Sequence, residues 1–239
     1  MVLLFVFLLT IVASFIQRVS GFGFGIFVMM FFPFFLPSYG ESVMLSGLLA
    51  GSTALMIAVK NWKYICWRMM GWVVFFNVLF SFLATEYMRS MSNSTLKQCL
   101  GVMLILIALY FFFGEGRMGK IFKSKSAQVT IGSISGIMGG MFAMPGPPIV
   151  LYCISTLENK REYVTTLQAF SVVLNVFYTF FRAKAGFYSD DTWLCWVIGI
   201  GGAVIGSSLG ERCFEIISNR TLKLIVYGMM IISGLVAIL

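Results

Sequence analysis

The chain has no histidine and very few charged residues. Its 239 residues include 17 Lys or Arg, nine Asp or Glu and no His, so charged residues make up only 11%. Histidine is the commonest metal ligand and the commonest proton carrier near neutral pH, and a Ser/His/Asp triad requires one. The five cysteines are scattered without Cys-x-x-Cys spacing. We therefore expect no metal site, no cofactor and no enzymatic activity.

Polar residues are scarce as a whole. Hydrophobic residues make up 59% of the chain, whereas soluble domains have about 45–50% apolar and about 25% charged residues. The hydrophobic runs are about 18–20 residues long, which is enough to cross a hydrocarbon core of about 30 Å. We expect an all-α, multi-pass integral membrane protein of the bacterial-type plasma (inner) membrane, with the lipid bilayer as a partner.

The remaining charge is basic, with a net value of +8. We expect no nucleic-acid partner, because nucleic-acid binding requires a clustered basic face. Basic loops at the anionic cytoplasmic leaflet explain the charge more simply.

Two short motifs occur once in each half of the chain. SGFGFG at 20–25 is followed 115 residues later by SGIMGG at 135–140, and SNSTLK at 92–97 is followed 126 residues later by SNRTLK at 218–223. Apolar repeats that each open with a broken helix are typical of membrane transporters. We predict a first transmembrane repeat at 1–113, a basic cytoplasmic linker at 114–126 and a second transmembrane repeat at 127–239.

Each predicted repeat contains one interrupted hydrophobic stretch and three continuous ones. The interrupted stretches cover about 2–36, broken at 21–25, and about 128–157, broken around 139–148. The continuous segments lie at about 42–59, 69–85, 98–113, 165–181, 192–209 and 222–239.

The basic residues of the loops bear on the topology. If each interrupted stretch crosses once, the Lys and Arg outside Arg18 divide nine against seven between the two sides. If each stretch is a re-entrant hairpin, they divide twelve against four, with Arg182 and Lys184 counted as loop residues. The positive-inside rule favours the hairpins, which give three crossings per repeat, inverted repeats and an outward-facing N-terminus. A first stretch that crosses twice remains an alternative.

The break at 143–148 contains three prolines, and a new helix can begin at Pro147 or Pro148. Such a break is tolerated in a membrane only where it is buried in protein or lines a cavity, and the N-terminus of the new helix favours an anion. We therefore expect substrate-binding residues in both motifs and both breaks. They are Ser20, Gly21, Gly23, Gly25, Ser135, Gly139, Gly140, Pro145, Gly146 and Pro147.

Glycines spaced four residues apart also let helices pack closely, as at 132–140 and 202–210. We interpret the 202–210 set as a packing surface. For the two breaks we favour binding, because packing alone does not explain three prolines.

Four polar residues inside hydrophobic stretches are further candidates. Arg18 lies beside the first break, where it either pairs with an oxyanion, reaches the membrane interface or binds a carbonyl freed by the break. Gln168, Ser171 and Asn175 share one helix face, and they either bind substrate or cross-link helices.

The stretch SGFGFGIFVMMFFPFFLP, its counterpart SGIMGGMFAMPGPPIVLY and the SN-x-TLK element together resemble the TauE/SafE sulfite-exporter family of anion permeases. The resemblance covers essentially the whole chain. It implies export of a small anion, most simply a sulfur-containing oxyanion or organosulfonate such as sulfite or sulfoacetate. With the duplicated breaks, it predicts alternating access around a central site. The competing hypothesis is a membrane-embedded scaffold or assembly protein without transport activity. The sequence leaves the oligomeric state open.

Overall fold

The computed structural model describes residues 1–114, 124–157, 159–214 and 235, and all regular elements in these ranges are helices. The first half comprises α1 (Val2–Ser20), α2 (Phe24–Met29), α3 (Phe32–Phe35), α4 (Tyr39–Lys60), two short 3-10 helices at Trp62–Tyr64 and Trp67–Met69, α5 (Gly71–Met88) and α6 (Asn93–Gly114). The second half comprises α7 (Lys125–Phe142), α8 (Gly146–Thr156), α9 (Lys160–Lys184) and α10 (Asp190–Cys213). The predicted segment at 222–239 and the second SN-x-TLK motif lie outside the described residues.

The five continuous segments within the described residues agree with α4, α5, α6, α9 and α10 to within five residues at each end, and both interrupted stretches are broken. The first SN-x-TLK motif marks the start of α6. Ser92 precedes the helix and its Oγ accepts a hydrogen bond from the Thr95 backbone N–H at 3.1 Å. Serine is a favoured residue at this position because its oxygen satisfies an N–H that the helix leaves unpaired.

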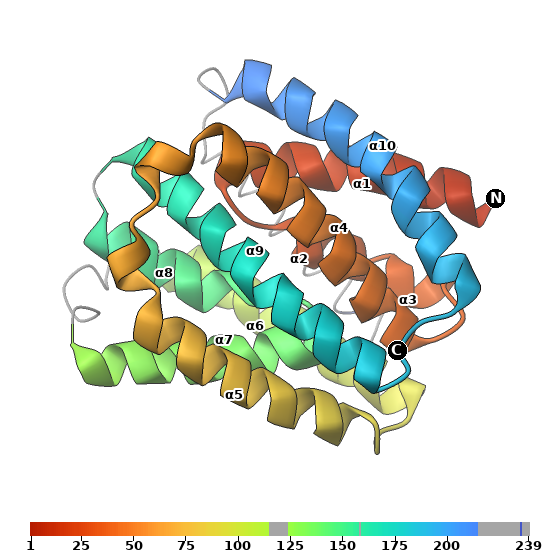
Figure 1. Ribbon diagram of the computed structural model, residues 1–239. Coiled ribbons are helices and arrows are strands. Elements are labelled where there is room, and N and C mark those ends of the chain that lie inside the picture. The colour runs from red at the N-terminus through yellow and green to blue at the C-terminus, as the bar shows by residue number, and fades with distance from the viewer. Residues whose placement is uncertain (115–123, 158, 215–234, 236–239) are drawn as a thin grey trace.

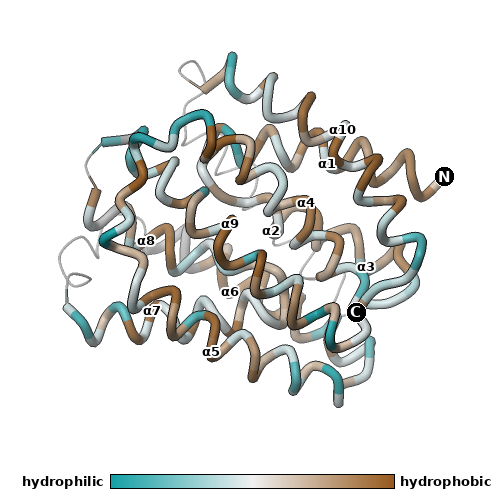
Figure 2. Tube along the Cα trace, in the orientation of Figure 1, coloured by the Kyte–Doolittle hydropathy of each residue, from teal (hydrophilic) through white to brown (hydrophobic). Residues whose placement is uncertain are grey.

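Five of the described helices are long and apolar enough to cross a membrane, namely α1, α4, α5, α9 and α10. Figure 2 shows that hydrophilic residues gather toward the helix ends, while hydrophobic residues fill the middle of the bundle. This distribution is that of an integral membrane protein.

The long helices form three packed pairs. α1 packs along α10, α5 packs along α7, and α4 packs along α9. In Figure 1 the α4–α9 pair lies between the other two. Each pair joins one helix from the first half of the chain to one from the second. The short helices α2 and α8 pack against α4 and α9 respectively.

Glycines at four-residue spacing bring two of these pairs into close contact. On α10, a Cβ added at Gly202 would lie 2.6 Å from the carbonyl oxygen of Phe7 in α1. On α7, a Cβ added at Gly136 would lie 2.5 Å from the carbonyl oxygen of Asn77 in α5. These distances leave no room for a side chain. The packing role of the 202–210 set is confirmed, and the 132–140 set packs in the same way.

The connections between helices gather at two ends of the bundle. Figure 1 shows the α3–α4 and α9–α10 connections at one end, and the α4–α5 and α8–α9 connections at the opposite end. The N-terminus lies at the end that holds the α3–α4 connection. The first 36 residues therefore begin and finish at the same end of the bundle.

We predict that Gly202→Ala lowers the thermal unfolding midpoint of the purified protein, because the new methyl group must push α10 away from α1. Overpacking of this kind costs about 1–3 kcal/mol. The matched control is Gly201→Ala, where a Cβ would meet only the Phe7 ring at 3.5 Å. The control should unfold at or above the wild-type temperature, since Ala favours a helix over Gly by about 1 kcal/mol. Equal midpoints for the two variants would contradict the packing role.

Candidate functional site

The first break is built by two glycines in the left-handed region. Gly21 has φ of 85° and ends α1, where its N–H donates to the Gln17 carbonyl oxygen at 2.9 Å. Gly23 has φ of 100° and precedes α2. This backbone conformation is accessible to glycine at little cost. Ser20 closes the turn, because its Oγ lies 2.8 and 2.6 Å from the carbonyl oxygens of Ile16 and Phe22, which share its single donor.

The second break separates α7 from α8. Ala143 ends α7 in the left-handed region with φ of 57°, and its N–H donates to the Gly139 carbonyl oxygen at 3.2 Å. Ser135 holds the turn, since its Oγ donates to the Pro145 carbonyl oxygen at 2.6 Å. α8 then begins at Gly146, one or two residues before the predicted start at Pro147 or Pro148.

The prolines limit what the N-terminus of α8 can donate. Among its first four residues, Pro147 and Pro148 carry no N–H. Only Gly146 and Ile149 can therefore offer a backbone N–H to a ligand. The positive end of the helix dipole remains at the same place.

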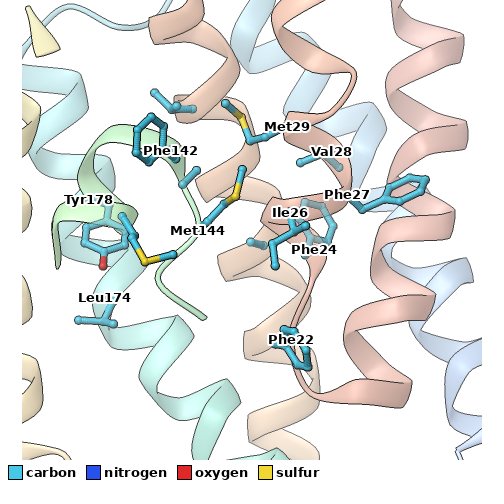
Figure 3. Packing of buried hydrophobic residues seen from close by; sticks show 14 of the residues in the cluster. Phe22, Phe24, Ile26, Phe27, Val28, Met29, Phe142, Met144, Leu174 and Tyr178 are labelled. Carbon is cyan, nitrogen blue, oxygen red and sulfur yellow. The ribbon is translucent and has the colours of Figure 1, made fainter. Parts of the chain in front are cut away.

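The two breaks meet around one cavity of about 60 Å³. They touch at Gly25, where an added Cβ would overlap the Ala143 carbonyl oxygen. Figure 3 shows Phe22, Phe24 and Ile26 on the first break facing Met144 across this region. The cavity is lined by eight of the predicted site residues: Gly21, Gly23, Gly25, Pro145, Gly146, Pro147, Ser171 and Asn175.

The polar groups of the cavity wall are neutral. Gln17 lines the cavity, and its Nε2 donates to Gln168 Oε1 at 2.7 Å. Gln168 lies behind it and donates from Nε2 to the Gly21 carbonyl oxygen at 2.8 Å. Asn175 Nδ2 donates to the Ser171 carbonyl oxygen at 2.8 Å. No charged side chain is among the residues that line the cavity.

A charge lies directly behind this wall, on the same face of α9. Gln168, Ser171 and Asn175 continue at helical spacing to Tyr178 and Arg182. Arg182 is 0% exposed, so it is not the loop residue that the charge count assumed. In the twelve-to-four division, the other three cations on the same side of the membrane as Arg182 are unaffected.

The Arg182 guanidinium lies between three helices. Nη1 donates to the Val43 carbonyl oxygen in α4 at 2.8 Å, Nη2 donates to the Gly139 carbonyl oxygen in α7, and the group stacks over the Tyr178 ring at 5.2 Å. None of the carboxylates in the described ranges forms an ion pair with it. A Cβ added at Gly47 would lie 2.5 Å from Arg182 Nη1 and 3.0 Å from Asn175 Oδ1, so the cation adjoins the cavity wall.

Hydrogen bonds connect this region to the second break. The Tyr178 hydroxyl donates to Asn77 Oδ1 at 2.6 Å, and Asn77 Nδ2 donates to Ser135 Oγ at 2.9 Å. Ser135 in turn donates to Pro145. Asn77 therefore cross-links three helices, and the conformation of the break depends on residues of α5 and α9.

Arg182 also changes the electrostatics of the second break. The C-terminus of α7 carries a partial negative charge, and the N-terminus of α8 carries a partial positive charge of similar size. Gly139 belongs to the last turn of α7, and its carbonyl oxygen accepts from the guanidinium. A full positive charge on this end outweighs the negative dipole, which leaves the break with a positive potential.

Six of the predicted residues lie outside the cavity lining: Arg18, Ser20, Ser135, Gly139, Gly140 and Gln168. Ser20 and Ser135 hold the two turns and Gln168 lies behind Gln17, whereas the other three lie at helix contacts. Arg18 forms an ion pair with Glu211 of α10, with Nη2 and Oε1 3.2 Å apart. Gly139 packs against Tyr178, and a Cβ at Gly140 would lie 2.7 Å from the Ser81 carbonyl oxygen in α5.

Sequence reasoning missed Gln17 and Arg182. The signal for Gln17 was an amide inside a hydrophobic stretch, one turn before the first glycine. The signal for Arg182 was its place on the face already occupied by Gln168, Ser171 and Asn175.

Comparison with known proteins identifies the family. The family model for the sulfite exporter TauE/SafE matches residues 6–237. No curated protein and no solved structure matches the chain. The match includes both helix breaks and every residue that lines the shared cavity. This integral membrane protein therefore belongs to the TauE/SafE family of membrane transporters.

Proposed function

We propose that the protein exports small anions, most simply a sulfur-containing oxyanion or organosulfonate such as sulfite or sulfoacetate, by alternating access around the central cavity. The observation that carries this proposal is that both helix breaks line one cavity. A scaffold in which breaks only pack helices has no need for a shared cavity between them. Transporters commonly bind substrate where two broken helices meet.

The chemistry of the cavity supports an anion. The positive end of α8 adjoins it, Ser171 lines it, and Arg182 supplies a charge without a carboxylate partner in the described ranges. Donors and dipoles of this kind bind an oxyanion without a fixed countercharge in contact with it. The volume of about 60 Å³ favours a small oxyanion such as sulfite over a bulky substrate.

The pairing of the helices supports inverted repeats at 1–113 and 127–239. If α1 corresponds to α7 and α5 to α10, the α1–α10 pair becomes the α7–α5 pair when the halves are exchanged. The central α4–α9 pair then exchanges its own members. The α1–α2–α3 stretch starts and finishes at one end of the bundle, as a re-entrant hairpin does.

The same arrangement supports an orientation in the membrane. Lys60, Arg161 and Arg212 lie near helix ends at the α4–α5 and α8–α9 end of the bundle, which we assign to the cytoplasm together with the 114–126 linker. With the cytoplasm negative, a singly charged anion that leaves gains about 2.3 kcal/mol per 100 mV. Export by this route needs no coupled ion.

We predict that proteoliposomes containing the protein carry sulfite flux that reverses with the sign of a potassium diffusion potential. Ser171→Leu should abolish this flux, because the larger side chain fills the cavity. Ser208→Leu is the matched control, since Ser208 is an exposed residue of α10 outside the cavity. The measurement is radiolabelled sulfite uptake against protein-free liposomes. Wild-type flux in Ser171→Leu would argue against the central site, and flux that ignores the potential would argue against electrogenic export.

A second prediction concerns the re-entrant hairpins. Single cysteines at Pro37 and Asn159, in a background without the five native cysteines, should react with an impermeant thiol reagent from opposite sides of the membrane. The reason is that each hairpin returns to the side it entered from. Labelling of both positions from the same side would rule out inverted repeats.

A third prediction concerns the charge of Arg182. Arg182→Gln should raise the KM for the anion roughly tenfold, equivalent to about 1.4 kcal/mol of binding free energy. Arg182→Lys should recover part of this loss, because it keeps the positive charge. Tyr178→Phe is the control, since it removes a hydrogen bond of the same network without changing charge. If Arg182→Lys and Arg182→Gln raise KM equally, the charge is irrelevant and the residue is only structural.

A further inference from the structure

A second cavity lies at the basic end of the bundle. It has a volume of about 210 Å³, and its lining includes Arg18, Asn61, Arg161, Thr165 and Glu211. The residues come from the C-terminal ends of α1, α4 and α10 and from the first turns of α9. We call it the basic vestibule.

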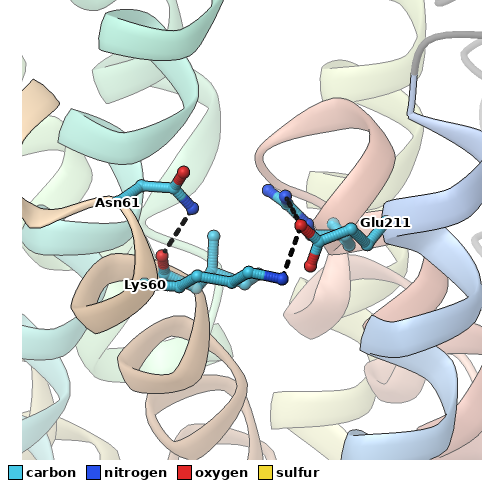
Figure 4. A network of polar contacts seen from close by, with 5 residues as sticks. Lys60, Asn61 and Glu211 are labelled. Atoms are coloured by element: carbon cyan, nitrogen blue, oxygen red, sulfur yellow. Dashed lines mark hydrogen bonds and ion pairs between the residues drawn. The ribbon is translucent and has the colours of Figure 1, made fainter.

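Positive charge exceeds negative charge in this vestibule. Arg18 Nη2 and Lys60 Nζ both bind Glu211 Oε1, at 3.2 and 2.8 Å. Figure 4 shows Lys60 reaching across to Glu211, next to Asn61. Arg161 adds a third cation, and no carboxylate of the described ranges pairs with it. The lining therefore holds two cations, Arg18 and Arg161, and one carboxylate, and Lys60 reaches that carboxylate from beside the lining.

Arg18 is the largely buried cation of the vestibule wall. Its side chain is only 9% exposed, and its guanidinium lies 5.1 Å from the centre of the Phe214 ring. Its Nε is buried and has no hydrogen-bond partner. Because Nε is buried, a ligand in the vestibule meets Arg18 only through the exposed part of its guanidinium group.

One layer of residues separates the vestibule from the central cavity. Gln17 lines the central cavity, and the next residue, Arg18, lines the vestibule. On the opposite wall Val164 lines the vestibule, and its Cγ2 would lie 3.4 Å from a Cβ added at Gly21, which lines the central cavity. The two cavities are thus consecutive along α1 and α9.

We infer that the basic vestibule is a loading site for a small oxyanion on its way to the central cavity. Arg18 and Arg161 bind the oxyanion, and charge-assisted hydrogen bonds from two guanidinium groups supply the selectivity. Glu211 forms an ion pair with Arg18 when the vestibule is empty, so an arriving oxyanion competes with this carboxylate for Arg18. This inference rests on the proposed anion transport, and it adds a second site and an internal competitor.

Because of this competition, substitutions of Arg161 and Glu211 should change the anion affinity of the vestibule in opposite directions. Arg161→Gln should weaken anion binding at the vestibule roughly three- to tenfold, since it removes a charged donor. Glu211→Gln should strengthen binding by a similar factor, because it removes the competitor. Arg212→Gln is the matched control: Arg212 is exposed, adjoins Glu211 in sequence and does not line the vestibule. Arg161 is exposed, so its substitution should leave the fold intact.

The experiment is calorimetric titration of the purified protein with sulfite at fixed ionic strength, together with KM and kcat from proteoliposome flux. We expect two bound anions per chain, a KM that rises in Arg161→Gln and falls in Glu211→Gln, and a kcat within about twofold of wild type in Arg161→Gln. Arg212→Gln should behave as wild type. Ser171→Leu should remove the central anion and keep the vestibule anion.

The outcomes separate the two proposals. The loading site would be overturned if the protein transports sulfite but binds one anion, with an affinity that neither Arg161→Gln nor Glu211→Gln changes. The proposed function would not be affected by this result. Equal changes in Arg161→Gln and Arg212→Gln would also overturn the loading site, since they would reflect general surface charge. No flux and no bound anion in the wild type would overturn both.

Discussion

The structure depends on the requirement that backbone carbonyls freed by a helix break must find donors within the protein, because hydrocarbon offers none. Two such carbonyls are satisfied by side chains, Gly21 by Gln168 and Pro145 by Ser135. The Gly139 carbonyl at the end of α7, which accepts from the Ala143 N–H, also accepts from Arg182. The donors come from α7 and α9, so the breaks can exist only where these helices surround them. The α4–α9 pair and the two glycine-packed pairs outside it provide this enclosure.

At the two breaks, side chains of the described residues bind the backbone acceptors but not the backbone donors of α8. The carbonyl oxygens accept hydrogen bonds from protein side chains, and the Gly139 carbonyl accepts from the positively charged Arg182. Gly146 and Ile149, the two residues of the first turn of α8 that keep an N–H, line the cavity together with Ser171. This asymmetry is the electrostatic basis of the anion site proposed above.

Local sequence predicted the features that local chemistry determines. Glycine and proline mark both breaks because their backbone preferences leave few alternatives, and hydrophobic runs mark the spans because lipid requires them. The shared face of Gln168, Ser171 and Asn175 followed from helical spacing alone. The partner of Arg18 could not be predicted, because Glu211 is distant in sequence and meets it only through the α1–α10 packing. Arg182 was assigned to a loop because a cation near the end of a hydrophobic segment looks exposed, whereas its burial depends on Val43 and Gly139 from two other helices.

The glycine contacts have a consequence for the order in which the protein is made. The glycines that accommodate α1 and α5 lie on α10 and α7, which belong to the second half of the chain. A ribosome synthesises α1 and α5 first, when neither has its partner helix in the membrane. Lipid or the insertion machinery must cover these faces until the later helices arrive. The first half therefore has to wait for the second during biosynthesis, and a truncated chain that ends in the linker lacks the surfaces against which its own helices pack.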